Sequence, residues 1–368
     1  MRLKIIFFIL TSFIIIFLGN IYNKRQILKE KIGQMILVGF KGKEVPDYLK
    51  AQLKDNIIGG IILFDYDVTS KSFDRNIENP KQVKSLISDL QNNAKTPLFI
   101  SVDQEGGLIN RLKPEYGFPK TLSAKVLGEK DDAKLTYENA KVIAETLKSL
   151  GFNLNFAPVV DVNTNPENPV IAGKERSYSS NPYKVAEHSE QVIKAHKDLD
   201  ILTALKHFPG HGSSSSDSHL GFVDVSETWN EKELIPYKEL INTGKVEIVM
   251  TAHVFNKKLD EKYPATLSKK SLSKLRKDFA YDGIIISDDL QMNAIAKHYS
   301  IEEAIPLMVN AGVDIFCIGN NLEIDENIVP KVIDIVMEKI FSGEISEEQI
   351  ETSYNKIISL KKKYKIIR

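Results

Sequence analysis

The sequence predicts an α/β protein, a single (β/α)8 (TIM) barrel behind an N-terminal apolar segment. Two observations predict this fold: eight short apolar runs alternate with stretches of helical periodicity, and no Pro/Gly/Ser-rich linker divides them. Several runs are almost continuously Ile, Val, Leu or Phe, as expected of parallel strands buried on both faces. A doubly wound open sheet is the alternative, because the pattern alone does not show closure. The runs are Met35–Phe40, Ile57–Phe64, Pro97–Val102, Phe152–Val162, Ile201–Leu205, Glu247–His253, Gly283–Ser287 and Val313–Gly319.

Length and composition fit one large domain, which we expect to be a monomer. The chain has 368 residues, a length common for a single barrel, and its 42% hydrophobic content is enough for a sizeable core. Lys plus Arg and Asp plus Glu both total 49, so the charge does not favour nucleic acid as a partner. The lone cysteine, Cys317, excludes a disulfide within one chain and a cysteine-based zinc cluster.

The first residues are not expected to belong to the barrel. Arg2 and Lys4 lead into an apolar stretch from Ile5 to Leu18, a pattern typical of an export signal or a short membrane anchor rather than a core helix. No small-x-small pair is well placed for cleavage, which favours an uncleaved anchor. We therefore divide the chain into a signal or anchor segment, residues 1–23, and a barrel domain, residues 24–368. Residues 1–23 would associate with a membrane and hold the barrel outside the cytoplasm.

Helix signals stand between the predicted strands. Pro80 occupies a first helical position and is followed by apolar residues at helical spacing. Ser300 and Ser346 each begin a capping-box pattern, with Glu or Gln three residues on. The final helix ends in lysines at 361–363 and 365, which we expect to be a solvent-exposed end that complements the helix dipole.

Polar side chains follow five consecutive predicted strands. In a barrel the carboxyl ends of the strands share one face, where function collects. Burying so many polar groups costs free energy unless a ligand, water or mutual pairing satisfies them. A polyhydroxylated ligand fits this pattern, because charged and forked side chains bind hydroxyls directionally. The groups are Asp103 with Arg111 nearby, Asp161 followed by Arg176, Lys206 with His207, His253, and Asp288.

The segment after the fifth predicted strand combines reactive and flexible residues. Lys206-His207-Phe208-Pro209-Gly210-His211-Gly212 leads into a serine run, and Asp217 and His219 follow. A strand that ends in such groups and enters a Gly/Ser loop is typical of a site with a movable flap. A plain polar surface loop is the alternative interpretation.

A metal site is a rival explanation for the same residues. Histidines 207, 211, 219 and 253 together with Asp288 could supply ligands. However, the first strand carries no His-x-His pair, and no helix carries a His-Glu-x-x-His motif. We therefore expect neither a metal nor another cofactor.

Seven segments between Asp103 and Met292 carry a family resemblance. They are SVDQEGG with Arg111, NFAPVVDV, GKERSYS, KHFPGHG with DSH behind it, VMTAHV, PATLS and ISDDLQM. Through them the chain resembles glycoside hydrolase family 3, in particular its β-N-acetylhexosaminidase branch. That branch includes bacterial β-N-acetylglucosaminidases that recycle peptidoglycan. KHFPGHG with a downstream Asp-x-His is the most specific of these features.

The resemblance implies a role for each matching residue. Asp288 matches the catalytic nucleophile, His219 the general acid/base, and Asp217 the carboxylate partner of that histidine. Leu108 departs from the pattern, since many relatives have a basic residue there; this leaves contacts beyond the first sugar open. The positions that match sugar-binding residues are Asp103, Arg111, Arg176, Lys206 and His207.

These residue types suit retaining glycoside hydrolysis. Such an enzyme needs an ionised nucleophile on one side of the sugar and a proton donor at the leaving oxygen. Histidine titrates near neutrality, and a neighbouring Asp217 would favour its charged form. The expected reaction is hydrolysis of terminal, non-reducing β-linked N-acetylglucosamine in muropeptides or related N-acetylhexosaminides. The alternatives are phosphorolysis of the same linkage, β-glucosidase-type specificity and a non-catalytic sugar-binding protein.

Neighbouring polar residues are predicted to support the site. We expect Asp289 to be structural and to cap the segment that follows. Asp161 and His253 would hold ligand-binding groups in place, and Glu105 would anchor the loop after the third strand. His211 would orient the flap. The only tryptophan, Trp229, would pack in the interior.

Overall fold

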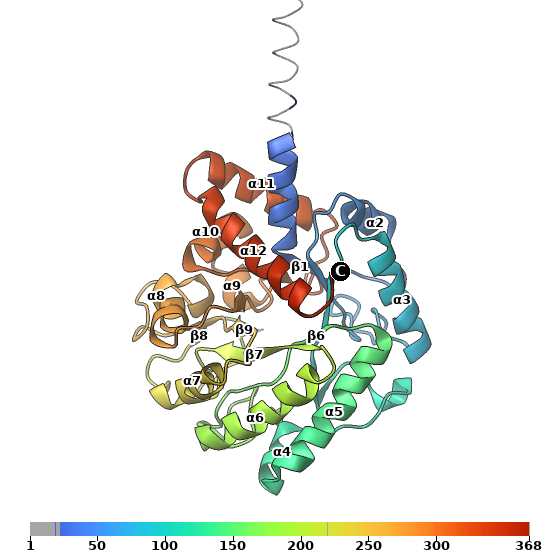
Figure 1. Ribbon diagram of the computed structural model, residues 1–368. Coiled ribbons are helices and arrows are strands. Elements are labelled where there is room, and N and C mark those ends of the chain that lie inside the picture. Colours follow the sequence, from blue (N-terminus) through green and yellow to red (C-terminus); the bar gives the residue numbers. More distant parts are fainter. Residues whose placement is uncertain (1–18, 20–22, 219, 368) are drawn as a thin grey trace, which may run out of the picture.

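Eight short parallel strands form a sheet that nearly closes into a barrel (Figure 1). The computed structural model describes residues 19, 23–218 and 220–367. Each strand pairs with the next one along the barrel, and the last pairs with the first. A single parallel bridge between Ile286 and Ile315 brings the two remaining edges together. The strands are β1 (Ile36–Val38), β2 (Gly60–Ile62), β3 (Phe99–Val102), β6 (Leu154–Asn155), β7 (Leu202–Phe208), β9 (Ile248–Thr251), β11 (Ile284–Ile286) and β12 (Phe316–Ile318).

All eight strands lie within the apolar runs of the sequence, apart from the end of β7. Every residue in them is buried, as expected for parallel strands covered on both faces. The bridge between Ile286 and Ile315 favours a barrel over the open sheet. The fifth strand, β7, continues beyond Leu205 to Phe208. Lys206 and His207 are therefore part of the strand and are held by the sheet.

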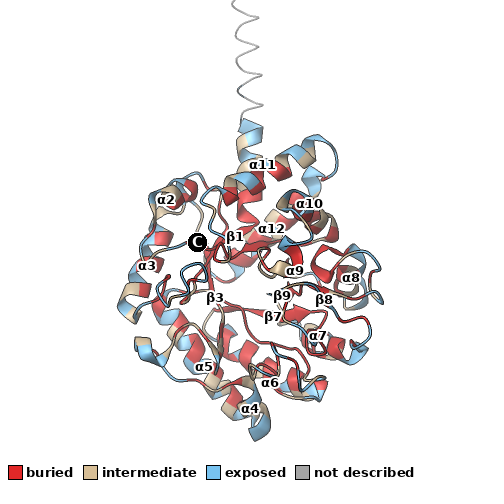
Figure 2. Ribbon diagram, turned by 180° about the vertical axis from the view of Figure 1, so that it is seen from behind, coloured by how far each residue is buried: buried red, intermediate tan, exposed pale blue. Residues whose placement is uncertain are grey.

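Helices surround the sheet and bury the faces that they turn toward it (Figure 2). Two further strand pairs lie outside the barrel: β4 (Gln104–Gly106) with β5 (Ile109–Asn110), and β8 (Val223–Asp224) with β10 (Val254–Phe255). The α-helices are α2 (Asp47–Lys54), α3 (Pro80–Asn93), α4 (Ala124–Lys130), α5 (Ala133–Leu150), α6 (Pro182–Lys197), α7 (Ile235–Asn242), α8 (Lys269–Ser273), α9 (Asn293–Ala296), α10 (Ile301–Ala311), α11 (Ile328–Phe341) and α12 (Glu347–Lys363).

The predicted helix starts are confirmed. Helix α3 begins at Pro80, and the side chain of Asn79 caps it by accepting from the backbone N–H of Gln82. Ser300 and Ser346 both form capping boxes, at the starts of α10 and α12.

The prediction for the end of the last helix is wrong at one residue. Lys361 is fully buried, and its ammonium donates to Gln34 Oε1 at 2.8 Å and to the carbonyl of Gly59 at 2.9 Å. The ring of Phe99 lies 4.9 Å from the same ammonium. The helix crosses the amino-terminal end of the barrel, so its lysine stem fills the core instead of reaching solvent.

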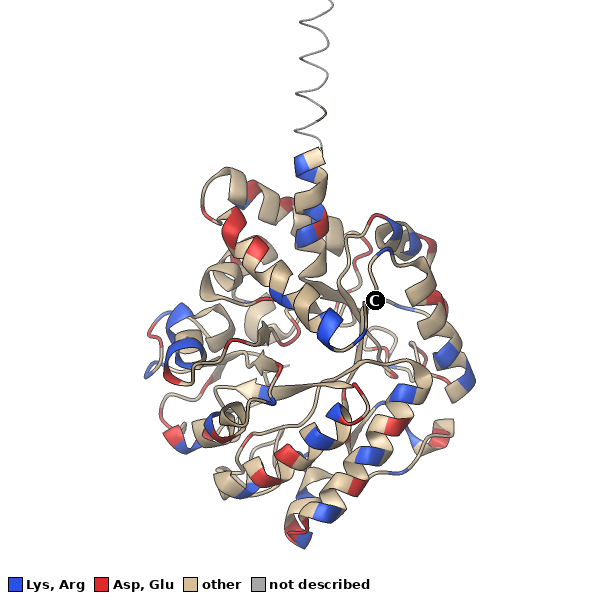
Figure 3. Ribbon diagram, viewed as in Figure 1, with Lys and Arg blue, Asp and Glu red and all other residues tan. Residues whose placement is uncertain are grey.

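The segment before the first strand is described in part. Residues 23–34 are helical and lead into β1. The predicted signal or anchor, residues 1–23, lies outside the described residues except for positions 19 and 23. Within the described ranges, no helix has the length and apolar character needed to cross a bilayer. Lys, Arg, Asp and Glu are interspersed along the outer helices (Figure 3).

Candidate active site

The carboxyl ends of the barrel strands bring the predicted site residues to one face. Asp103 follows β3, Lys206 and His207 lie in β7, and Asp288 follows β11. Burial raises the pKa of the Cys317 thiol, and the charges of Asp289, Asp288 and Asp103 raise it further. The charges of Asp103 and Asp288 thus both influence the pKa of the Cys317 thiol in β12, although these aspartates follow strands on different sides of the barrel.

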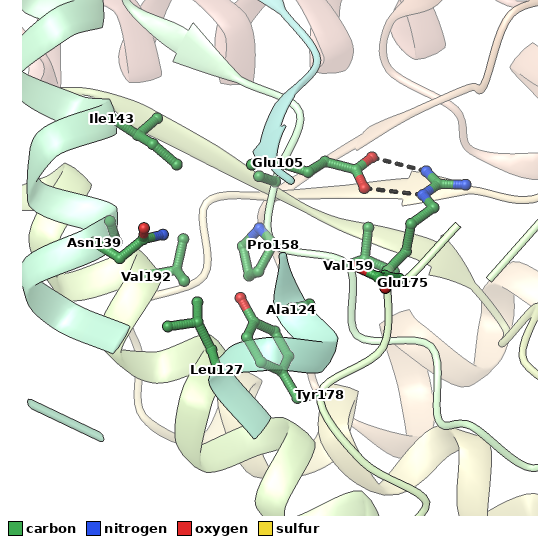
Figure 4. Close-up of a pocket in the computed structure, with 14 residues that line it drawn as sticks. Glu105, Ala124, Leu127, Asn139, Ile143, Pro158, Val159, Glu175, Tyr178 and Val192 are labelled. Atoms are coloured by element: carbon green, nitrogen blue, oxygen red, sulfur yellow. Dashed lines mark hydrogen bonds and ion pairs between the residues drawn. The ribbon is translucent and has the colours of Figure 1, made fainter. Parts of the chain in front are cut away.

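Lys206 is the centre of a buried network of charges. Its ammonium donates to Asp103 Oδ1 at 2.8 Å and lies 2.7 Å from Glu105 Oε1. Arg176 binds the same Glu105 with two parallel bonds, from Nε at 2.9 Å and from Nη2 at 2.8 Å (Figure 4). The side chains of Lys206, Glu105 and Arg176 are only 2%, 8% and 9% exposed. A fork-to-fork pair of this kind fixes both partners in space.

This network holds its groups in their charged forms. Burial alone would raise the pKa of Glu105, but the charges of Arg176 and Lys206 hold it well below its usual value. Burial alone would lower the pKa values of Lys206 and Arg176, yet the nearby carboxylates raise both. The network therefore presents fixed charges to a ligand at neutral pH.

Arg111 extends the network toward the rim of the barrel. Its guanidinium lies 3.9 Å from Asp103 Oδ2 and 3.8 Å from Asp65 Oδ1. Lys113 lies 2.6 Å from the other oxygen of Asp65, a carboxylate that is buried. These longer contacts leave Arg111, whose side chain is 29% exposed, able to reorient toward a ligand.

His207 is held from both sides of its ring. Nδ1 lies 2.7 Å from Asp161 Oδ2, and Nε2 lies 3.3 Å from Nη2 of Arg176. This pattern is satisfied when Nδ1 donates to Asp161 and Nε2 accepts from Arg176. Asp161 is fully buried and also accepts the backbone N–H of His211 at 2.8 Å. The predicted supporting role of Asp161 fits these contacts.

The two aspartates after β11 have different surroundings. Asp288 is partly exposed, and its Oδ1 accepts the backbone N–H of Asp289 at 2.8 Å. Asp289 is also partly exposed, and it accepts the backbone N–H groups of Gly319 at 2.8 Å and Gln291 at 3.1 Å. His253 Nε2 lies 2.9 Å from the carbonyl of Asp289. These contacts fit the predicted structural role of Asp289.

The loop between β7 and β8, residues 209–222, is called the flap loop below. It carries Asp217, which is partly exposed, while His219 lies outside the described residues. The carbonyl of Ser218 accepts the backbone N–H of Ala294, at 3.2 Å. Ala294 lies in α9, six residues after Asp288, so the flap loop is tied to the segment that follows the candidate nucleophile. His211 contacts the hydroxyls of Ser214 and Ser218, which fits its predicted role in orienting the flap.

Asp103, Asp161 and His207 on this face are bound to other protein groups. Among the residues that the structure describes, no three His, Cys, Asp or Glu side chains are grouped so that they could hold a metal ion.

Comparison with known proteins places the chain in a family. The model of the glycosyl hydrolase family 3 N terminal domain matches residues 27–360. The chain belongs to glycosyl hydrolase family 3. Beta-hexosaminidase A of Pseudoalteromonas piscicida is 33% identical over 347 residues, which cover 87% of this chain and 56% of that protein. Beta-hexosaminidase LpqI of Mycobacterium tuberculosis is 30% identical over 342 residues, covering 90% of this chain and 82% of its own length.

A solved family 3 structure has the same fold. It is a β-N-acetylglucosaminidase from Paenibacillus sp. str. FPU-7, with a TM-score of 0.84 and 36% identity. The alignment covers 92% of this chain and 62% of the Paenibacillus chain. This family 3 chain therefore spans less than two thirds of the length of two of its relatives.

The sequence analysis did not predict the contacts of two carboxylates at this end of the barrel, Glu105 and Asp65. Glu105 was expected only to anchor a loop, yet it joins Arg176 and Lys206. Asp65 was not singled out at all. The signal for Glu105 is its position two residues after Asp103, which places both carboxylates beside one lysine. Asp65 follows the second apolar run, so the rule that barrel strands end in functional groups could have found it.

A small cavity lies behind the Glu105–Arg176 pair, between the barrel and helices α4, α5 and α6 (Figure 4). Leu127, Asn139 and Tyr178 line it, and its volume of about 20 Å³ is enough for roughly one water molecule. It cannot hold a sugar ring. This cavity is therefore not the site of a sugar ligand.

Proposed function

We propose that this chain is a retaining glycosidase that removes terminal, non-reducing β-linked N-acetylglucosamine. The observation that carries the proposal is the Lys206 network, with Asp103, Glu105 and Arg176, at the same end of the barrel as Asp288. Family membership and relatives named β-hexosaminidase and β-N-acetylglucosaminidase support it.

The network would bind the sugar through its unused hydrogen-bond capacity. Lys206 has three N–H donors and directs two of them to Asp103 and Glu105, so the third is assigned to a sugar hydroxyl. Asp103 would accept from another hydroxyl, and Arg111 would close over the ring. Arg176 uses Nε and Nη2 on Glu105, so Nη1 is its group for the ligand. His207 would complete the wall of the pocket.

The chemistry would follow two displacements. Asp288 attacks the anomeric carbon and forms a covalent glycosyl-enzyme, while His219 gives its proton to the leaving oxygen. Asp217 supports the imidazolium of His219. In the second step His219 takes a proton from water, which displaces Asp288 and restores the enzyme with retained anomeric configuration.

A direct assay tests this proposal. The purified chain and its Asp288→Ala variant are offered chromogenic β-N-acetylglucosaminide and β-glucoside, with and without inorganic phosphate. We expect turnover of the first substrate alone, independent of phosphate and lost in the variant. Turnover of the glucoside would overturn the sugar assignment, and phosphate-dependent release of sugar 1-phosphate would indicate a phosphorylase. Saturable binding without turnover would indicate a sugar-binding protein.

We further propose a monomeric barrel, residues 24–368, that residues 1–23 anchor outside the cytoplasm, where it acts on cell-wall muropeptides. The basic and apolar pattern of the first residues supports the anchor. Cell fractionation and the mass of the mature N-terminus test the location. Loss of about the first twenty residues would rule out the anchor. Release of N-acetylglucosamine from purified muropeptides tests the natural substrate.

A further inference from the structure

A buried carboxylate lies beneath the flap loop and has no part in the chemistry above. Glu233 belongs to the short 3-10 helix Glu231–Leu234, before α7, and its side chain is fully buried. Its Oε2 accepts the backbone N–H groups of Gly212 at 2.9 Å and Ser213 at 3.4 Å. These two amides begin the segment that leads to Asp217. Glu233 therefore holds the root of the flap loop.

The other side of the carboxylate faces polar groups that are poorly satisfied. Glu233 Oε1, Ser213 Oγ and Tyr237 Oη are all buried, and none has a hydrogen-bond partner among the described residues. Ser213 is near enough to lower the pKa of Glu233 but is not placed for a good hydrogen bond. This side of the carboxylate can accept a new bond when the charge or the position of the group changes.

Glu233 changes its charge close to neutrality. Burial raises its pKa to about 7, and the nearby charge of Asp161 adds to this, while Ser213 and the two amides oppose it. The other titratable groups around it are Tyr237 on α7 and His211 at the loop root; burial raises the pKa of the first and lowers that of the second to about 4. His207, paired with Asp161, lies in β7 below the loop.

The root of the flap loop is packed tightly against Glu233. A Cβ at Gly210 would lie 2.6 Å from Cβ of Glu233, so only glycine permits this close approach. On the opposite side, Asn168 Nδ2 donates to the carbonyls of His211 at 2.7 Å and Gly212 at 3.1 Å. The root is thus held between Asn168 and Glu233.

We propose that Glu233 is a positioning residue: its ionised carboxylate fixes the root of the flap loop, and protonation weakens this hold and displaces Asp217. An ionised acceptor binds backbone N–H groups about twice as strongly as a neutral one. The protonated carboxyl of Glu233 would also need an acceptor for its O–H group, and the hydroxyl oxygen of Ser213 or Tyr237 could serve. The effect on catalysis rests on the proposed function, whereas the effect on the loop does not.

The chain contains its own probe for this movement. Trp229 is the only tryptophan, is buried, and donates its indole N–H to the carbonyl of Pro209 at 3.0 Å. Pro209 lies three residues before Gly212, so tryptophan emission reports on the loop root. We expect the emission of the wild-type chain to change with a midpoint near pH 7, and Glu233→Gln to lack this change.

A matched control is available on the same turn. Glu231 is exposed and lies two residues away, so Glu231→Gln should retain the emission change. If the change persists in Glu233→Gln, it belongs to another group, and the proposal is wrong. A wild-type chain without any change would also overturn it.

A second variant covers the case in which Glu233→Gln does not fold. The hydroxyl of Ser213 lowers the pKa of Glu233, so Ser213→Ala should move the midpoint to higher pH. An unmoved midpoint would contradict the assignment to Glu233.

Turnover then separates this proposal from the proposed function. In an active enzyme, kcat should fall more steeply below about pH 7 in the wild type than in Glu233→Gln, because only the wild type loses the ionised carboxylate there, while KM changes by less than about twofold. Identical pH profiles for kcat would show that Glu233 does not position the catalytic loop. A chain that shows the emission change but no turnover would retain the loop anchor and refute the glycosidase.

Discussion

The ammonium of Lys206 in β7 lies 2.7 Å from Oε1 of Glu105 in β4, the short strand after β3, although β7 and β3 are separated in the barrel sheet by β6. The same ammonium bonds Asp103, and the same carboxylate bonds Arg176. Positive and negative groups alternate through this network, so each charge is held by a neighbour of opposite sign. The charged groups of this network are therefore oriented by the protein itself before any ligand binds.

Glu105 should be the most sensitive residue of this network. Glu105→Gln leaves Lys206 and Arg176 with one carboxylate fewer in a buried site, so we expect a loss of roughly 3–5 kcal/mol in the free energy of unfolding at neutral pH. The folded-state pKa of Glu105 is held below its usual value of 4.5, so its contribution is present above that pH and is lost as the pH falls through the folded-state pKa.

Denaturant unfolding at neutral and at acidic pH measures this effect. The difference between wild type and Glu105→Gln should shrink as the solution is acidified. Glu167→Gln, a change of an exposed glutamate, should leave stability unchanged at both pH values. A difference that does not depend on pH would show that Glu105 is not charged in the folded protein.

Arg111 should affect binding without affecting stability. Its ion pairs are long, at 3.8 Å and 3.9 Å, and its side chain is 29% exposed. We expect Arg111→Met to change stability by less than about 1 kcal/mol. KM for the N-acetylglucosaminide should rise roughly 10- to 100-fold, since a hydrogen bond to a charged group contributes about 1.5–3 kcal/mol. Steady-state kinetics of Arg111→Met test this, with Lys120→Met as a control at an exposed position. If Arg111→Met has the same KM as the wild type, Arg111 does not bind the substrate.

Substitutions at Asp288 and Asp289 should affect different properties, namely catalysis and stability. If Asp288 is the proposed nucleophile, Asp288→Asn should lower kcat at least about a thousandfold, with little loss of stability because its side chain is partly exposed. Asp289→Ala leaves the backbone N–H groups of Gly319 and Gln291 without an acceptor, so it should destabilise the fold by roughly 2–3 kcal/mol. Thermal unfolding and kinetics of both variants test this; full turnover in Asp288→Asn would exclude it as the nucleophile.

The fold could be predicted because its signal is local. Apart from the end of β7, every barrel strand lies within an apolar run, since burial on both faces favours apolar residues at consecutive positions. The caps at Ser300 and Ser346 are equally local, because a capping box involves only four residues.

Contacts between distant strands could not be predicted in the same way. Glu105 was expected to anchor a loop, because its position two residues after Asp103 does not by itself show that Lys206 and Arg176, both distant in sequence, surround it. Lys361 was expected in solvent, because helical spacing does not show that the last helix crosses the barrel end. In both cases tertiary position decides whether a charged side chain is paired, buried or exposed.

Lys361 should make stability depend on pH in the neutral-to-alkaline range. Burial lowers its pKa to about 7, and its ammonium donates to two neutral oxygens. Below about pH 7 the lysine is charged in both states, so the cost of burying the charge is fully present. Between about pH 7 and the usual value of 10.5 only the unfolded chain binds the proton, so the wild-type protein gains stability as the pH rises.

Lys361→Met removes this titration while keeping the length of the side chain. At low pH the variant should match or exceed the wild type, because no charge is buried. Toward high pH the wild type should become the more stable protein, since it keeps the bonds to Gln34 and Gly59. Unfolding midpoints measured at several pH values test this crossing, with the exposed neighbour Lys362→Met as a control that should follow the wild type. Parallel curves for wild type and Lys361→Met would mean that Lys361 keeps its charge in the folded state, which the ring of Phe99 would then have to stabilise.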